Sequence, residues 1–166
     1  MRKAFLLFFI TSILIGCSKL TGSPIGEMND IISIQKLKDN QLFSHEDETL
    51  VELFLQKIEK ANQLIEELNL LIEQFEKTDE FQEAIEMMDT ARKEAQKIAE
   101  ELSAIHFQTE KMMTYKASFE KELLNYANGL EMQIDGVENW DSKKITDGFK
   151  QTELAKTAIT KLIEQL

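Results

Sequence analysis

The sequence predicts an all-α protein in which residues 44–166 form an antiparallel up-down bundle of three to four long, coiled-coil-like helices. Apolar residues recur in steps of three and four along most of this region, which is the period of an amphipathic helix. One proline and six glycines leave few turns, which argues against a many-stranded sandwich or barrel. The length of 166 residues suits one domain with an N-terminal extension.

The first 16 residues have the character of a cleaved signal peptide. A positive start, Met1-Arg2-Lys3, precedes twelve largely apolar residues, 4–15, whose helical length of about 18 Å is too short for a bilayer core of about 30 Å. Leu14, Ile15, Gly16 and Cys17, the only cysteine of the chain, resemble the bacterial lipobox. The resemblance implies cleavage before Cys17 and attachment of diacylglycerol and further acyl chains, such as palmitate, to that residue. Two or more acyl chains hold a protein stably on a membrane.

Residues 17–43 are expected to form a lipidated tether between the anchor and the bundle. The run Gly22-Ser23-Pro24 cannot sustain a helix, and a flexible chain of this length reaches about 28 Å. Residues 31–42 either form a short helix that packs on the bundle or stay disordered, and the sequence leaves both open.

Two helices, residues 45–77 and 80–104, account for the first half of the bundle. Ser44 with Asp47, and Asp79 with Gln82, are predicted capping boxes at their starts. The apolar faces hold residues at spacings of three and four: Val51, Phe54, Ile58, Ala61, Ile65, Leu68, Ile72 and Phe75 in the first helix, and Phe81, Ala84, Met88, Ala91, Ala95, Ile98, Leu102 and Ile105 in the second. The short connection makes the two helices antiparallel neighbours.

The rhythm slips at residues 103–109, which predicts a break before a third helix over 108–135. Its core face holds Met112, Tyr115, Phe119, Leu123, Tyr126, Leu130 and Ile134, and Gly136 is expected to end it as a C-cap. Asp141 or Ser142 then caps a fourth helix, 142–166, whose core face holds Ile145, Phe149, Thr152, Ala155, Ile159, Leu162 and Leu166.

The search for chemical motifs gives no enzyme class, no metal site and no cofactor apart from the lipid on Cys17. Neither His45 nor His106 has a glutamate three residues before it, so the di-iron bundle pattern is absent. Residues 135–147 have Trp140 and Thr146 where a calcium loop needs glycine and glutamate. A net charge of −11 argues against nucleic acid as a partner.

Four residues are candidates for partner contact, each with a plainer structural interpretation beside it. Trp140, in the turn before the last helix, either anchors a partner or packs over the end of the bundle. Met87, Met112 and Met113 either line an adaptable groove or fill gaps in the core.

Taken whole, the chain resembles the small helical lipoproteins of Gram-positive bacteria. The resemblance rests on Leu14-Ile15-Gly16-Cys17, on the break at 102–109, and on the turn Asn139-Trp140-Asp141-Ser142. Where related proteins often have a proline at the break, this chain has Ile105-His106-Phe107, so a continuous helix is an alternative there.

The resemblance implies a lipid anchor on the extracytoplasmic face of the cell membrane and carries over no catalytic residue. The expected function is a non-enzymatic interaction or structural module that meets an envelope or extracellular protein. A ligand-carrying bundle and a surface lipoprotein that binds a host ligand are the alternatives. The heptads of the first two helices also leave room for pairing between chains, that is, for a homo-oligomer.

Overall fold

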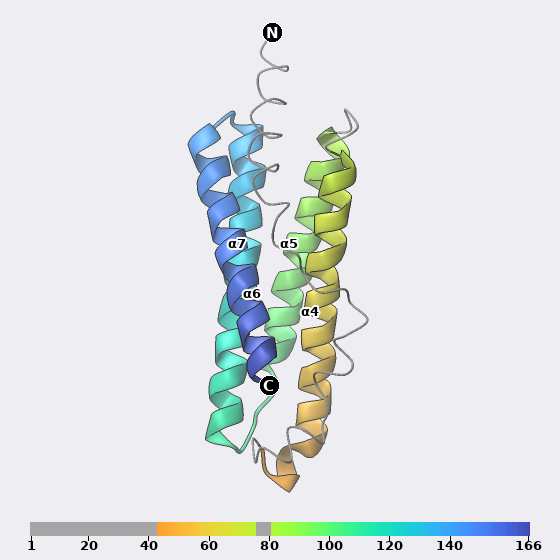
Figure 1. Cartoon of the computed structure of the whole chain (residues 1–166), viewed down its shortest axis with the longest axis vertical. Coiled ribbons are helices and arrows are strands. Elements are labelled where there is room, and N and C mark those ends of the chain that lie inside the picture. Colours follow the sequence, from red (N-terminus) through yellow and green to blue (C-terminus); the bar gives the residue numbers. More distant parts are fainter. Residues whose placement is uncertain (1–42, 76–80) are drawn as a thin grey trace.

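The computed structural model describes residues 43–75 and 81–166, and within them the side chains of residues 73–75 and 81 are not described. A single turn of 3₁₀ helix and four α-helices follow one another along the chain: η3 His45–Asp47, α4 Glu48–Phe75, α5 Phe81–Ser103, α6 Glu110–Glu138 and α7 Ser142–Gln165. Each helix packs against the next in sequence, and Figure 1 shows two hairpins, α4–α5 and α6–α7, standing side by side. The predicted all-α up-down bundle is therefore confirmed, with four helices.

The predicted break between the second and third helices is also confirmed. α5 ends at Ser103 and α6 begins at Glu110, so the alternative of one continuous helix is wrong. The connecting segment turns because Ile105 and Phe107 both leave the helical path to be buried in the core. His106, between them, remains exposed, as expected for a residue of the break.

The core contains most of the residues that the spacing predicted, contributed by all four helices. Three aromatic rings pack edge to face at the end where α5 joins α6: Phe54 lies 5.6 Å from Phe107 and 6.2 Å from Phe119 between ring centroids. Such pairs add to the stabilisation that burial provides. The largest buried side chains, each almost without exposed surface, are Tyr126, Phe54, Phe119, Ile58, Ile98, Leu102, Met112, Leu123, Ile159, Leu166 and Val51.

Glycines bring α6 and α7 unusually close. A Cβ atom added to Gly148 would lie 2.7 Å from the carbonyl oxygen of Gly129, and one added to Gly129 would lie 2.7 Å from Cγ2 of Thr152. Gly136 is buried inside α6 and faces Ile145 in the same way, at 2.8 Å. The prediction that Gly136 ends the third helix is wrong, because close packing between helices also selects glycine and α6 continues to Glu138.

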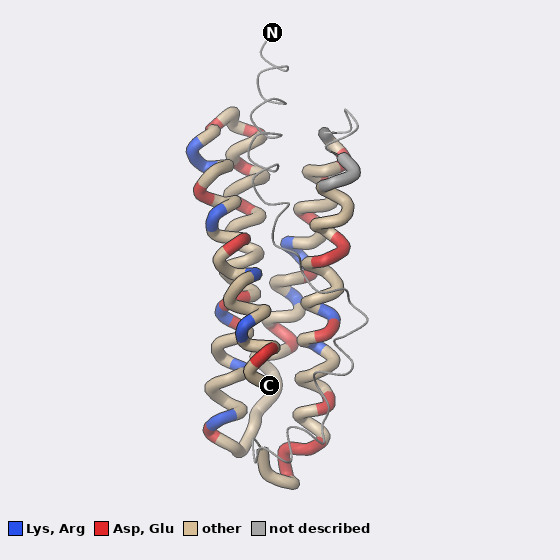
Figure 2. The backbone as a smooth tube through the Cα atoms, in the orientation of Figure 1, with Lys and Arg blue, Asp and Glu red and all other residues tan. Residues whose placement is uncertain are grey.

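Charge is divided unequally between the two hairpins. The described residues of the α4–α5 hairpin hold 14 acidic and five basic residues, while residues 110–166 hold ten acidic and eight basic ones. Figure 2 shows the acidic positions along α4 and α5, and a more even mixture of signs along α7. All five basic residues of the first hairpin lie in ion pairs, including Lys57 with Glu101 at 2.6 Å. Apart from Asp47, which is buried, most of the acidic residues that these basic residues leave unpaired lie at exposed positions.

Several sequence predictions fall outside the described residues. They are the signal peptide, the lipobox with Cys17, the tether apart from Phe43, and the capping box that uses Asp79. Phe43, the first described residue, packs against the core. Within the described ranges, no helix is long and apolar enough to cross a membrane.

Candidate interaction surface

The end of the bundle where the described chain begins is fastened to the α5–α6 connection by one buried carboxylate. Asp47, with no exposed surface, accepts hydrogen bonds from the backbone N–H groups of Gln108 at 2.8 Å and Thr109 at 2.9 Å, and from Oγ1 of Thr109 at 2.5 Å. The N–H of Ser44 donates in turn to Oγ1 of Thr109 at 3.2 Å. The start of the first hairpin is therefore bound to the start of the second.

The capping box predicted for Ser44 and Asp47 is wrong. The side chain of Ser44 makes no capping hydrogen bond, and the Asp47 carboxylate serves the N-terminal end of α6 instead of its own helix. Burial by itself raises the pKa of the Asp47 carboxyl, but its hydrogen bonds to Gln108 and Thr109 outweigh burial and hold the pKa below its usual value. Asp47 is consequently ionised at neutral pH and acts as a fixed structural anion.

The opposite end of the α6–α7 hairpin carries Trp140. Its φ of 59° lies in the left-handed region, which favours glycine, and no other described residue has a positive φ. The N–H of Trp140 donates to the carbonyl of Val137 and the N–H of Asp141 to the carbonyl of Gly136, at 3.3 and 2.7 Å. This is the bonding pattern of a Schellman motif, whose left-handed position is usually occupied by glycine.

The indole of Trp140 is open to solvent. Trp140 keeps 55% of its surface exposed. Less than half of its surface is therefore covered by packing over the end of the bundle, which was the alternative interpretation. The turn itself is well fixed, because the Asp141 carboxylate accepts a hydrogen bond from the N–H of Lys144 at 3.0 Å and caps α7 as predicted. A rigid turn thus presents a large aromatic ring to solvent.

Ion pairs engage both lysines that follow the turn. Lys143 donates to Asp147 at 2.8 Å, and Lys144 forms a close pair with Asp135 across the two helices. The hydrogen bond to Asp147 raises the pKa of Lys143, that to Asp135 raises the pKa of Lys144, and the pKa of Asp147 is lowered by Lys143. Glu138, two residues before Trp140 in the chain, is exposed and makes no ion pair.

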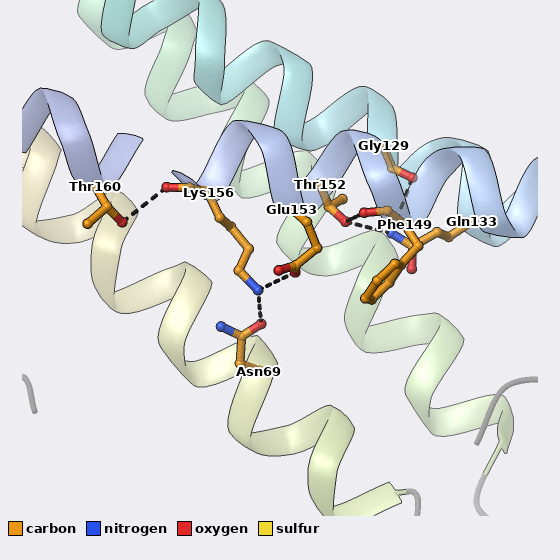
Figure 3. Close-up of polar contacts among 8 residues, drawn as sticks. All are labelled: Asn69, Gly129, Gln133, Phe149, Thr152, Glu153, Lys156 and Thr160. Carbon is orange, nitrogen blue, oxygen red and sulfur yellow. Dashed lines mark hydrogen bonds and ion pairs between the residues drawn. The ribbon is translucent and has the colours of Figure 1, made fainter. Parts of the chain in front are cut away.

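A polar bridge joins α7 to α4 on the side where the two hairpins meet. Figure 3 shows Nζ of Lys156 between two oxygens, Oδ1 of Asn69 at 3.1 Å and Oε1 of Glu153 at 2.6 Å. Thr152 lies one turn before Lys156 on α7, and its Oγ1 accepts a hydrogen bond at 3.2 Å from the amide of Gln133 on α6. Of these contacts, only that of Lys156 with Asn69 links the second hairpin to the first, whereas that of Gln133 with Thr152 joins α6 to α7 within the second hairpin.

The methionines do not form one surface. Met112 is fully buried at the start of α6 and Met113 beside it is exposed, while Met87 packs half-buried against the core. Met87 precedes the end of α5 by sixteen residues, or about 24 Å of helix, so it lies far from the other two. A groove lined jointly by these residues does not exist in this arrangement, and Met112 touches no solvent.

Exposed leucines are a feature that sequence reasoning missed. Leu154 on α7 keeps 73% of its surface exposed and Leu70 on α4 keeps 56%. Neither stands on the apolar face predicted for its helix: Leu154 is next to Ala155, and Leu70 lies midway between Leu68 and Ile72. His45 is exposed, and its Nδ1 lies 3.0 Å from Oε2 of Glu48. In residues 43–75 and 81–166, no three His, Cys, Asp or Glu side chains gather in a way that could hold a metal ion.

Comparisons with protein-family models, with curated proteins and with solved structures find no match for this chain.

Proposed function

We propose that the protein is a lipid-anchored, non-enzymatic interaction module on the extracytoplasmic face of the cell membrane. Two observations support the proposal: Cys17 stands in a lipobox-like sequence, and the bundle presents an exposed tryptophan on a rigid turn. The proposed partner of the module is a protein of the cell envelope or of the extracellular space.

The geometry of the bundle supports a definite orientation for such a module. Residues 43–47 join the bundle beside Thr109, whereas Trp140 lies at the other end of α6. α4 has 28 residues, so about 42 Å of helix separate the two ends. With the lipid on Cys17, the tether would hold the Asp47 end toward the membrane and leave the Trp140 end pointing away from it.

The charge of the chain supports a lipid anchor in place of direct adsorption. A net charge of −11 is repelled by anionic lipid, and the described helices lack an apolar membrane span. Acyl chains on Cys17 would overcome this repulsion, because each buried CH₂ group contributes about 0.8 kcal/mol.

Metabolic labelling with a fatty-acid analogue tests the anchor. We expect the wild-type chain and a Ser18→Ala variant to incorporate the label and to fractionate with membranes. The Cys17→Ala variant should be unlabelled and should leave the membrane fraction. An unlabelled wild-type chain, or a Cys17→Ala variant that fractionates unchanged, would contradict the proposal.

Site-specific photo-crosslinking in cells tests the interaction module. A photoreactive amino acid is placed at position 140, and as a matched control at Thr49, which is exposed at the other end of the bundle. We expect a discrete crosslinked protein from position 140 and a different pattern or none from position 49. Equal crosslinking from both positions would show that contact is unspecific.

A further inference from the structure

The residue choice at the α6–α7 turn is unusual in two respects. The left-handed position of a Schellman motif is best served by glycine, yet it holds the only tryptophan of the chain. More than half of the residue's surface is also exposed, so burial alone does not account for its presence. A bulky aromatic that is both conformationally unfavourable and solvent-facing contributes little to the fold and is available for contact.

The charges around the turn select the kind of contact. Residues 131–147 hold five acidic and two basic residues, and both lysines are already paired with Asp135 and Asp147. Glu138 and Asp141, on either side of Trp140 in the chain, are exposed carboxylates. An aromatic face with carboxylates nearby attracts cations, and the planar guanidinium of arginine stacks on indole while it binds carboxylate oxygens.

We infer that the α6–α7 turn docks an arginine-containing basic segment of a partner protein, with a guanidinium over the Trp140 indole and the carboxylates of Glu138 and Asp141 beside it. This inference rests on the proposed function and names the partner chemistry at the same end of the bundle. The excess acid of the α4–α5 hairpin would draw such a segment toward the molecule from a distance. A second copy of the chain is disfavoured as occupant, because it carries the same net charge of −11.

The single tryptophan makes the docking directly observable, since all indole emission comes from position 140. The probes are end-capped hexaarginine and end-capped hexacitrulline, which match in size and shape but differ in charge. We expect hexaarginine to change the emission saturably and at lower concentration than hexacitrulline, with an affinity that falls as salt rises. Equal responses to the two peptides would overturn the inference, as would a blue shift produced by anionic vesicles alone.

Variants separate docking at the turn from diffuse attraction to an acidic surface. With labelled hexaarginine and fluorescence anisotropy, Trp140→Leu should weaken binding about fivefold, the size expected of one exposed cation–π contact. Trp140→Phe should retain most of the affinity. Glu138→Gln should weaken binding more than Glu52→Gln, which removes the same charge from an exposed position at the other end of the bundle.

The outcomes distinguish this inference from the proposed function. The inference would be overturned if Glu138→Gln and Glu52→Gln lost equal affinity for hexaarginine and Trp140→Leu bound it as tightly as the wild type does. Such results would show a diffuse attraction to the acidic surface. Lipid labelling of Cys17 and crosslinking from position 140 would stand in that case. If Trp140→Leu fails to fold by circular dichroism, the Trp140→Phe variant and the two glutamate variants still decide the question.

Discussion

Asp47→Ala removes the carboxylate that joins the start of the first hairpin to the start of the second. Three hydrogen bonds to a charged acceptor disappear: two backbone N–H donors, on Gln108 and Thr109, and the Thr109 hydroxyl. Hydrogen bonds to charged groups contribute about 1.5–3 kcal/mol each. Because Gln108 is exposed and Thr109 only half-buried, water can reach part of the freed donors. We therefore expect a loss of about 3 kcal/mol in the free energy of unfolding, near the lower end for removal of a buried charge.

Urea unfolding at pH 7, followed by helical circular dichroism, measures this loss. Asp47→Asn should lower the free energy of unfolding by less, about 1.5 kcal/mol, because the amide keeps one acceptor oxygen. The charge is lost, and the NH₂ group takes the place of one of the two oxygens that accepted hydrogen bonds from Gln108 and Thr109. Glu46→Gln is the matched control, since Glu46 is the exposed neighbour of Asp47 and its change should leave stability within about 0.5 kcal/mol of wild type.

The pH dependence provides an independent check on Asp47. Its folded-state pKa is lower than the ordinary value of 3.8, so its stabilisation is complete above that value and is lost as pH falls through the folded-state pKa. The difference in stability between wild type and Asp47→Asn should accordingly narrow below about pH 4. A loss under about 1 kcal/mol for Asp47→Ala, or a difference that stays constant down to pH 2, would refute the structural role assigned to this carboxylate.

Three further changes test the α6–α7 hairpin and its bridge to α4. Gly148→Ala should destabilise the protein by about 2 kcal/mol, because the added Cβ meets the Gly129 carbonyl at 2.7 Å; unchanged urea unfolding would refute the close approach. Trp140→Gly should be more stable than Trp140→Ala by about 1 kcal/mol, since both lose the ring and only glycine relieves the left-handed φ; the melting temperatures of the pair measure this, and the reverse order would contradict it. Lys156→Gln should cost under about 1 kcal/mol in urea unfolding, as an ion pair that water still reaches does, and a loss above about 2 kcal/mol would give the bridge to Asn69 a larger role.

The helices and most of the core were predictable from the sequence because helical burial follows a period of 3.6 residues. Phe54, Ile98 and Phe119 stand on apolar faces that spacing alone identifies, and all three are buried. The break also has a local signal, since a continued face would place Thr109 and Lys116 inside.

Features that depend on the approach of distant segments were not predictable. Asp47 and Thr109 are 62 residues apart, and no local pattern distinguishes a carboxylate that caps its own helix from one that serves another. Glycine is equally suited to ending a helix and to admitting a neighbouring backbone, so Gly136 had two interpretations and only the packing with Ile145 decides between them. Trp140 was singled out as a contact residue, but its left-handed φ depends on how α6 ends.

The unequal division of charge makes the two hairpins respond differently to ionic strength. Mutual repulsion among the surplus carboxylates opposes the pairing of α4 with α5, and dissolved salt weakens that repulsion. The α6–α7 pair, nearly neutral and held by contact between backbones, has little such repulsion to relieve. Backbone amides of α4 and α5 should therefore exchange with solvent more slowly as sodium chloride is added, while those of α6 and α7 change little.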